Sequence, residues 1–142
     1  MFDLPPCAED YADHYAVPME IVEAVAEQEG GAPGVVAENG NGTVDVGVMQ
    51  INSVWFEPEN PVDLTARGIT FERVRDEACT NIAVGVWILA QFHERMNHDW
   101  GRAIAAYNAG PNNWRAGLGY AREVIARLPD GSHDQDKTDA LE

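Results

Sequence analysis

Two carboxylic acids stand in unlike surroundings in this sequence. Glu29 closes a stripe of apolar residues, and Asp45 follows sixteen residues later inside a run rich in β-branched residues. Two carboxyl groups whose environments separate their pKa values can divide the roles of proton donor and charge stabiliser. Cleavage of a glycosidic bond is a reaction that uses that division. Glu29 and Asp45 are therefore the first candidates for a catalytic pair.

The element that must position Glu29 is a helix predicted over residues 19–29. Pro18 suits a helix start and Gly30 allows a left-handed helix end. Positions i, i+3, i+4 and i+7 of this helix are Val22, Val25, Ala26 and Glu29. Burial on that apolar face and the negative end of the helix dipole would both raise the pKa of Glu29, which favours a protonated acid near neutral pH. The alternative is a partly exposed Glu29 at a frayed helix end.

The element that must position Asp45 is a small β-hairpin beside the end of that helix. Two Asn-Gly pairs within residues 39–42 predict tight turns, and residues 43–51 have the β-branched content of short strands. Asp45, Gln50 and Asn52 are polar side chains in this apolar run. They need partners, either the backbone or a ligand rich in hydroxyl and amide groups. The alternative is that Asp45 caps a turn and that Asn52 starts the next helix.

Several segments occur in an order and at distances that resemble the soluble lytic transglycosylase domain. They are Glu29, residues 41–55, residues 78–82, residues 85–90 and residues 105–110. The resemblance is to the small VirB1-like branch, which is attached to type III and type IV secretion, conjugation and pilus machines. It covers about residues 7–128. The chain departs from the family pattern at Gly30, where a Ser commonly follows the catalytic Glu, and at Val48, where Leu is usual.

The resemblance implies an α+β, mainly α, lysozyme-like fold, with a helical core and a small β-hairpin that forms one wall of a cleft. We expect one such domain over residues 1–128. The resemblance also implies an enzyme, a peptidoglycan lytic transglycosylase that cleaves the MurNAc-GlcNAc β-1,4 bond, forms 1,6-anhydroMurNAc and opens the cell wall for a secretion, conjugation or pilus apparatus. Glu29 would protonate the glycosidic oxygen and then take the proton of that sugar's own 6-hydroxyl.

The hairpin also resembles that of C-type lysozyme, in which Asp45 falls on the position of the second catalytic carboxylate. Many lytic transglycosylases have no acid there and work with one Glu. Two alternatives therefore stay open, a lysozyme-type muramidase that hydrolyses the same bond and a non-catalytic peptidoglycan-binding scaffold. The role of Asp45 decides between the two enzymes.

The resemblance assigns further residues to the substrate. Those expected to bind it are Met49, Gln50, Asn52, Tyr107, Asn108 and Tyr120. Tyr107 would also orient Glu29, and its alternative is a core aromatic residue with a satisfied hydroxyl group. The implied partners are peptidoglycan glycan strands and components of a secretion, conjugation or pilus apparatus.

Cys7 and Cys79 are the two cysteines of the chain. Free thiols are the default for such a pair in a cytosolic protein, whereas the resemblance places a disulfide at these points in exported proteins. We therefore expect a disulfide and a periplasmic or exported protein. Residues 1–6 lack the charged start and apolar core of a signal peptide, so we interpret the sequence as a mature form.

Further helices are predicted around the site. The longest covers residues 79–96 and should be central and buried, because its apolar residues lie close to one face. The others are predicted over residues 62–67, 70–75, 100–107 and 120–128, with Thr70 and Asp99 as N-caps. Residues 129–142 are polar and carry five acidic side chains against Lys137, which predicts a disordered acidic tail.

Composition argues against several other classes of protein. A chain of 142 residues, 45% of them hydrophobic, fits one globular domain, which we expect to be a monomer. Its longest apolar run, residues 82–90, is far too short to span a membrane. A net charge of −15 argues against nucleic acid and anionic membranes as partners. No metal or cofactor is expected, because His93 and His98 lack the i, i+4 spacing of a helical zinc site.

Overall fold

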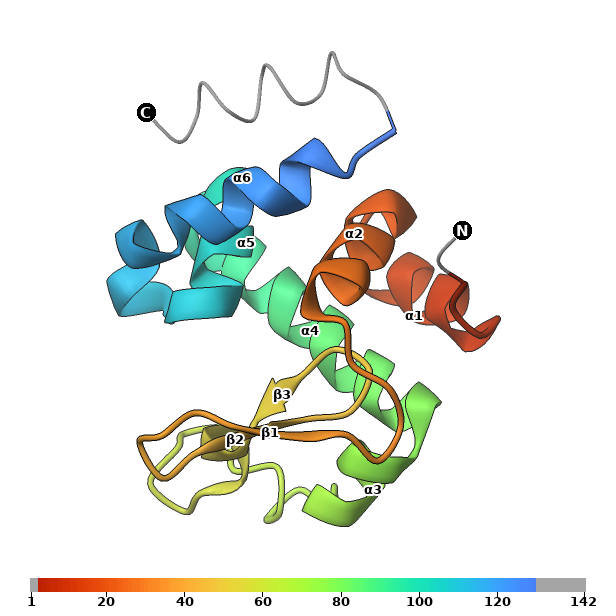
Figure 1. Ribbon diagram of the computed structural model, residues 1–142, viewed down its shortest axis with the longest axis vertical. Coiled ribbons are helices and arrows are strands. Elements are labelled where there is room, and N and C mark those ends of the chain that lie inside the picture. The colour runs from red at the N-terminus through yellow and green to blue at the C-terminus, as the bar shows by residue number, and fades with distance from the viewer. Residues whose placement is uncertain (1–2, 130–142) are drawn as a thin grey trace.

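The computed structural model describes residues 3–129, which form a mainly helical α+β fold of the lysozyme-like type with a small sheet beside the helices (Figure 1). The α-helices are α1 (Cys7–Tyr15), α2 (Met19–Glu29), α3 (Phe71–Asp76), α4 (Ala78–Arg95), α5 (Trp100–Ala109) and α6 (Leu118–Ala126). The strands are β1 (Val36–Glu38), β2 (Val44–Val46) and β3 (Ile51–Asn52), and the 3-10 helices are η1 (Ser53–Phe56) and η2 (Pro111–Gly117). The fold class that the sequence predicts is confirmed.

Helix α4 is the centre of the helical part. Its Ile82, Val86 and Leu89 are fully buried, and the helix contacts α1, α3 and α5. In Figure 1 it crosses the molecule between α1 and α2 on one side and α5 and α6 on the other. Gly85 lets α4 approach the hairpin, because a Cβ there would lie 2.5 Å from the sulfur of Met49. The helical core and the hairpin are therefore packed directly against each other.

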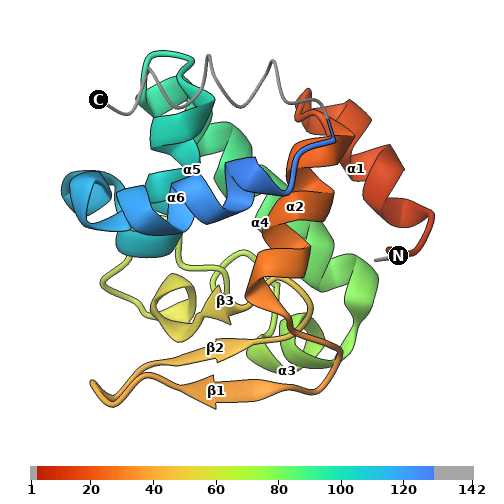
Figure 2. The ribbon, with the colours of Figure 1, turned by 45° about the horizontal axis from the view of Figure 1, so that its top comes forward.

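The three strands form an antiparallel sheet in the order β1-β2-β3. Residues 39–43 connect β1 to β2, and the sequence predicts tight turns within residues 39–42. Asp45 in β2 pairs with Ala37 on one side and with Asn52 on the other. Figure 2 shows the sheet at one end of the molecule, with β3 on the side nearest the helices. This register places Asp45 and Asn52 next to each other.

A buried amide fixes the loop that leads from β2 to β3. The side chain of Asn81 on α4 is fully buried, and its Oδ1 accepts a hydrogen bond of 2.7 Å from the backbone N–H of Met49. Its Nδ2 donates to the backbone oxygens of Val46, at 2.8 Å, and Val74, at 2.9 Å. Gly47 has φ +76°, and a Cβ there would overlap the Asn81 amide. The side chain of Asn81 thus joins the hairpin and α3 to α4.

Most predicted helices are confirmed. Helix α2 has the predicted bounds, α4 and α5 differ from theirs by one or two residues, and Thr70 and Asp99 cap α3 and α5 as expected. Helix α6 begins and ends two residues before the predicted 120–128. The predicted helix over residues 62–67 is wrong. That segment is a turn, in which Asp63 has φ +43° and a helix cannot continue.

Helices α1 and η2 are not predicted from the sequence. The buried face of α1 consists of Ala8 and Ala12, and its partly buried Tyr11 and Tyr15 give only a weak apolar stripe. The segment Pro111–Gly117 contains a non-helical residue, Asn113, so it lacks a regular period. Short or small-residue elements of this kind leave little periodicity for a sequence to show.

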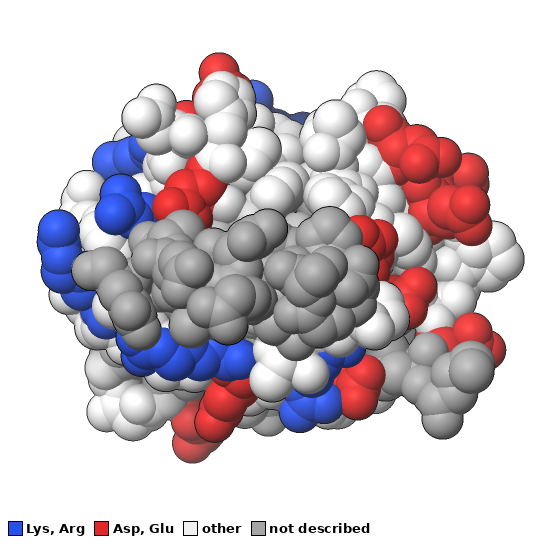
Figure 3. Space-filling model, turned by 90° about the horizontal axis from the view of Figure 1, so that it is seen from above, with Lys and Arg blue, Asp and Glu red and all other residues white. Residues whose placement is uncertain are grey.

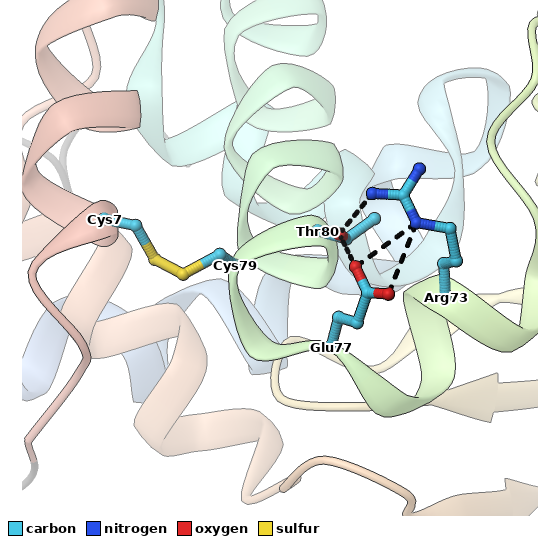
Figure 4. Close-up of a disulfide and its surroundings, with 5 residues drawn as sticks. All are labelled: Cys7, Arg73, Glu77, Cys79 and Thr80. Atoms are coloured by element: carbon cyan, nitrogen blue, oxygen red, sulfur yellow. Dashed lines mark hydrogen bonds and ion pairs between the residues drawn. A yellow bond between two sulfur atoms is a disulfide. The ribbon is translucent and has the colours of Figure 1, made fainter.

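Cys7 and Cys79 form a disulfide, as the resemblance implies (Figure 4). The bond joins the start of α1 to the first turn of α4, next to the corner where Arg73, Glu77 and Thr80 interact. The two cysteines are 72 residues apart in sequence. The disulfide therefore closes a loop that contains Glu29, Asp45 and the whole sheet.

Within residues 3–129 no helix is both long enough and apolar enough to cross a membrane. Except for Pro129, the predicted disordered tail over residues 129–142 lies outside the described residues.

Candidate active site

Glu29 is the last residue of α2, and the chain leaves the helix at Gly30, which has φ +67°. The left-handed conformation of Gly30 turns the chain toward the sheet directly after the acid. Gly31 is packed so closely on the hairpin that a Cβ there would overlap the backbone oxygen of Gly47. The side chain of Glu29 is half-buried and faces a cavity of about 300 Å³.

The environment of Glu29 raises its pKa from an ordinary 4.5 to about 7. Burial is the largest cause, because it disfavours the ionised form. A hydrogen bond from Tyr120 acts in the opposite direction, and the negative charge of Asp45 raises the pKa further. At neutral pH a large fraction of Glu29 side chains is therefore protonated, as a general acid must be.

Tyr120, on α6, is the tyrosine that contacts the acid. Its hydroxyl donates to Oε2 of Glu29 at 2.5 Å. The expectation that Tyr107 orients Glu29 needs correction, because the Tyr107 hydroxyl donates instead to the backbone oxygen of Met49 at 2.7 Å. Burial raises the pKa of both tyrosines, so both hydroxyls remain protonated donors. The assignment depends on how α6 packs on α2, which no local sequence signal gives.

A network of polar side chains fastens α6 to α2 beside the Glu29–Tyr120 pair. Nε2 of Gln28 donates to Glu123 at 2.7 Å, and Arg127 donates to Gln28 and to Glu27, both at 2.8 Å. Gln28 is the direct neighbour of Glu29, and Glu123 lies about one helical turn beyond Tyr120. The network holds the helix of the acid and the helix of its hydrogen-bond donor together.

Asp45 lines the same cavity as Glu29. Its Oδ1 accepts a hydrogen bond of 3.0 Å from Nδ2 of Asn52, its partner across the sheet. The Oδ1 of Asn52 accepts from the backbone N–H of Val54, so Asn52 also caps the 3-10 helix that follows. Asp45 is thus held in place by a residue that starts the next element, and its carboxylate remains on the cavity wall.

The remaining predicted residues divide into two groups. Gln50, Tyr107 and Asn108 line the cavity with Asn52, and Nε2 of Gln50 donates to the backbone oxygen of Gly47 at 2.9 Å. Met49 is not on the cavity wall, because its side chain is fully buried against α4. It contributes its backbone, which Asn81 and Tyr107 hold from two sides.

The cavity is also lined by residues that the sequence does not predict as site residues. They are Asn39, Asn41, Thr43, Ile51, Trp55 and Ile88. The Asn-Gly pattern predicts the two Asn residues only as turn formers, although the same pattern places amide groups at the tip of the hairpin. The N-acetyl and hydroxyl groups of a sugar are suitable partners for such amides.

A larger groove continues from this cavity. The groove encloses about 980 Å³ and shares with the cavity the residues Asn41, Thr43, Asn52, Trp55, Tyr107 and Asn108. Trp55 packs edge-on against Trp87 at 6.2 Å between ring centroids, so aromatic surface forms part of its wall. The site therefore has the shape of an extended cleft with Glu29 at one end. Within residues 3–129 no three His, Cys, Asp or Glu side chains gather so as to hold a metal ion.

Comparison with known proteins gives consistent matches. Residues 6–127 match the family described as "Transglycosylase SLT domain". Invasion protein IagB of Salmonella typhimurium (strain SL1344) is 30% identical over 113 residues, which are 78% of this chain and 67% of the relative. Protein IpgF of Shigella flexneri is 30% identical over 124 residues, which are 85% of this chain and 78% of the relative. The chain therefore belongs to the transglycosylase SLT domain family and is a lytic transglycosylase.

Proposed function

We propose that the enzyme cleaves the β-1,4 bond between MurNAc and GlcNAc in peptidoglycan and leaves a 1,6-anhydroMurNAc end. The observation that carries the proposal is the state of Glu29, whose pKa of about 7 keeps it available both as an acid and as a base at neutral pH. Both states are needed, because the reaction uses one carboxyl group twice.

In the first step the protonated Glu29 gives its proton to the glycosidic oxygen, the bond from C1 of MurNAc to that oxygen breaks, and positive charge develops on the sugar ring. In the second step the Glu29 carboxylate takes the proton of the 6-hydroxyl of the same MurNAc. The oxygen of that hydroxyl then forms a bond to C1 and closes the anhydro ring. Atoms and charge balance without water, and Glu29 ends protonated.

Other residues of the site fit roles in this sequence of steps. Tyr120 donates to Glu29 and so stabilises the carboxylate that exists between the two steps. Asp45 lies on the cavity wall, where its negative charge would stabilise the positive ring. Gln50, Asn52 and Asn108 offer amide groups to the N-acetyl and hydroxyl groups of the sugars.

Asp45 also supports a second candidate function, lysozyme-type hydrolysis of the same bond. A retaining glycosidase uses a second carboxylate on the wall of the same cleft, and Asp45 lines the cavity together with Glu29. In that mechanism water replaces the 6-hydroxyl and the product has a reducing end.

We propose further that the enzyme opens the cell wall for a secretion, conjugation or pilus apparatus and works in the periplasm or another exported compartment. The VirB1-like resemblance of the motifs supports the first part, and the relative from Salmonella typhimurium is called an invasion protein. The Cys7–Cys79 disulfide supports the second part, because such bonds persist in oxidising compartments.

The test is digestion of purified peptidoglycan followed by mass spectrometry of the soluble products. Ends of 1,6-anhydroMurNAc support the first candidate, reducing MurNAc ends support hydrolysis, and no products would leave a binding scaffold. Glu29→Gln should abolish cleavage, whereas Glu23→Gln, a change of an exposed acid on the same helix, should keep it. Full activity in Glu29→Gln would overturn the mechanism.

A further inference from the structure

We propose that Arg95 binds a carboxylate of the peptidoglycan strand and so makes the cleft prefer strands that carry peptide stems. The inference rests on the proposed function. It starts from an electrostatic conflict: the chain has a net charge of −15, yet the stems of its substrate also carry carboxylates. The cleft must place those carboxylates away from Glu29 and Asp45, the two acids that line its inner cavity.

The two ends of the cleft differ in charge. Glu29 and Asp45 lie at the inner end, where a substrate carboxylate would be repelled. The outer end is formed by the last turn of α4 and the start of η2, with Glu94, Arg95 and Asn112. Among the residues described here, Arg95 is the one Lys or Arg that lines either the cavity or the groove. Arg95 is therefore the positive side chain of the cleft that a substrate carboxylate can bind.

The guanidinium group of Arg95 has few partners within the described chain, so it can bind a ligand. Its side chain makes one hydrogen bond within residues 3–129, from Nη2 to Oδ1 of Asn112 at 3.3 Å, and no ion pair there. Four other arginines of the described chain are paired with acids, although acids far outnumber bases. A guanidinium group has five N–H donors, and its fork matches the two oxygens of a carboxylate. Asn112 uses one donor and holds the group at the groove edge.

The carboxylate can come from two sources on the strand. On intact peptidoglycan the lactyl group of MurNAc is joined to the stem, and the carboxylates belong to the peptide. On strands from which an amidase has removed the stems, the lactyl group itself ends in a carboxylate. Both sources present a carboxylate beside a sugar. A comparison of peptide-bearing with amidase-treated strands shows which of the two carboxylates Arg95 binds.

The experiment measures kcat/KM of the full chain on soluble peptide-bearing strands and on amidase-treated strands. Arg95→Gln should lose about fivefold on the peptide-bearing strands, a loss expected for an exposed ion pair, and little on the treated ones. The loss should shrink at high salt, because salt screens an exposed pair, and Arg95→Lys should restore part of it. The control is Arg122→Gln, since Arg122 is exposed, has no ion pair within the described chain and lines neither space. It should change neither value.

The outcomes are distinct from those that test the proposed function. A loss confined to the amidase-treated strands would keep the carboxylate site but overturn the preference for stems, because the site would then belong to the lactyl group. Equal losses on both substrates, or none, would overturn the inference while the wild type still cleaves. If the wild type cleaves neither substrate, the proposed function fails, and co-sedimentation with purified sacculi then compares wild type with Arg95→Gln. Equal binding in that assay would overturn the inference.

Discussion

Glu29 keeps a proton near neutral pH because the effects that raise its pKa outweigh the one that lowers it. Burial and the charge of Asp45 raise its pKa, and the hydrogen bond from Tyr120 lowers it. The net pKa of about 7 lies above the ordinary 4.5, so the folded state binds this proton more tightly than the unfolded state. The stabilising contribution of the proton is therefore complete below pH 4.5 and is lost as the pH rises through 7.

The raised pKa predicts that ionisation of Glu29 lowers the free energy of unfolding at alkaline pH. Glu29→Gln removes the ionisation and keeps an oxygen that can accept from Tyr120. At about pH 8 the variant should have a higher free energy of unfolding than the wild type, by roughly 3 kcal/mol, and at about pH 4 the two should be equal. Urea denaturation at both pH values measures this difference, with Glu23→Gln as the control. The variant and the wild type differ in free energy of unfolding by some amount at each pH. If that difference is the same at the acidic and the alkaline pH, the cost of burying the charged Glu29 is contradicted.

Tyr120 should control the pH range of activity. Because its hydrogen bond lowers the pKa of Glu29, Tyr120→Phe should move the alkaline limb of kcat/KM to higher pH. Loss of orientation should lower kcat about tenfold at the optimum. Tyr107→Phe is the matched comparison, since the Tyr107 hydroxyl binds the Met49 backbone and makes no bond to the acid. Equal pH profiles for Tyr120→Phe and the wild type would show that the bond does not set the pKa.

At the scale of residues, the sequence predicts which side chains line the cavity. It does not predict which of them form hydrogen bonds to each other. The predicted residues that line one cavity are Glu29, Asp45, Gln50, Asn52, Tyr107 and Asn108. The exchange of Tyr107 for Tyr120 as the partner of Glu29 follows from the packing of α6 on α2. Hydrogen bonds across 91 residues of sequence depend on tertiary structure and leave no local pattern.

At the scale of elements, the hairpin wall of the cleft depends on one buried amide. Asn81 bonds to the Met49 N–H and to two backbone oxygens, so an apolar residue of similar size removes one hydrogen bond from each of three buried groups. Asn81→Leu should lower the free energy of unfolding by about 3 kcal/mol or more. Gln91→Leu, an exposed change on the same helix, should have little effect. A thermal unfolding curve for Asn81→Leu that matches the wild type would contradict this role.

Elements with local signals are the ones that the sequence predicts correctly. Thr70 and Asp99 mark the starts of α3 and α5 by side-chain hydrogen bonds to the residue three positions later. The turn at residues 64–68 resembles a helix in sequence, because buried Leu64 lies near further apolar residues. The positive φ of Asp63, just before this turn, breaks the helix, and an Asp in the sequence gives little sign of that conformation.

At the scale of the whole molecule, the charge is unevenly distributed. Residues 3–90 hold sixteen acidic side chains and three arginines, whereas residues 91–129 hold three acidic side chains and five arginines. In the face shown in Figure 3, a broad acidic area lies at one edge and arginines lie at the opposite edge. The negative charge of the described chain therefore belongs to residues 3–90, and the arginine-rich part, residues 91–129, forms one wall of the groove.

The disulfide should stabilise the whole fold. Closing a loop of this length restricts the unfolded chain and contributes about 4 kcal/mol. Reduction, or the double change Cys7→Ser and Cys79→Ser, should lower the denaturation midpoint, and reductant should not affect the double variant further. Titration of the unreduced, denatured wild type should find no reactive thiol. Two reactive thiols in that titration would contradict the bond.

The tyrosine that touches the acid lies on α6, the last helix of the described chain, while the acid lies on the second. During synthesis of the chain, Glu29 is therefore added 91 residues before Tyr120, which donates the hydrogen bond to it. A chain that ends before Leu118 contains the acid but lacks Tyr120, whose hydrogen bond lowers the acid's pKa. For an enzyme that cuts the cell wall, this order makes full activity a property of the finished chain.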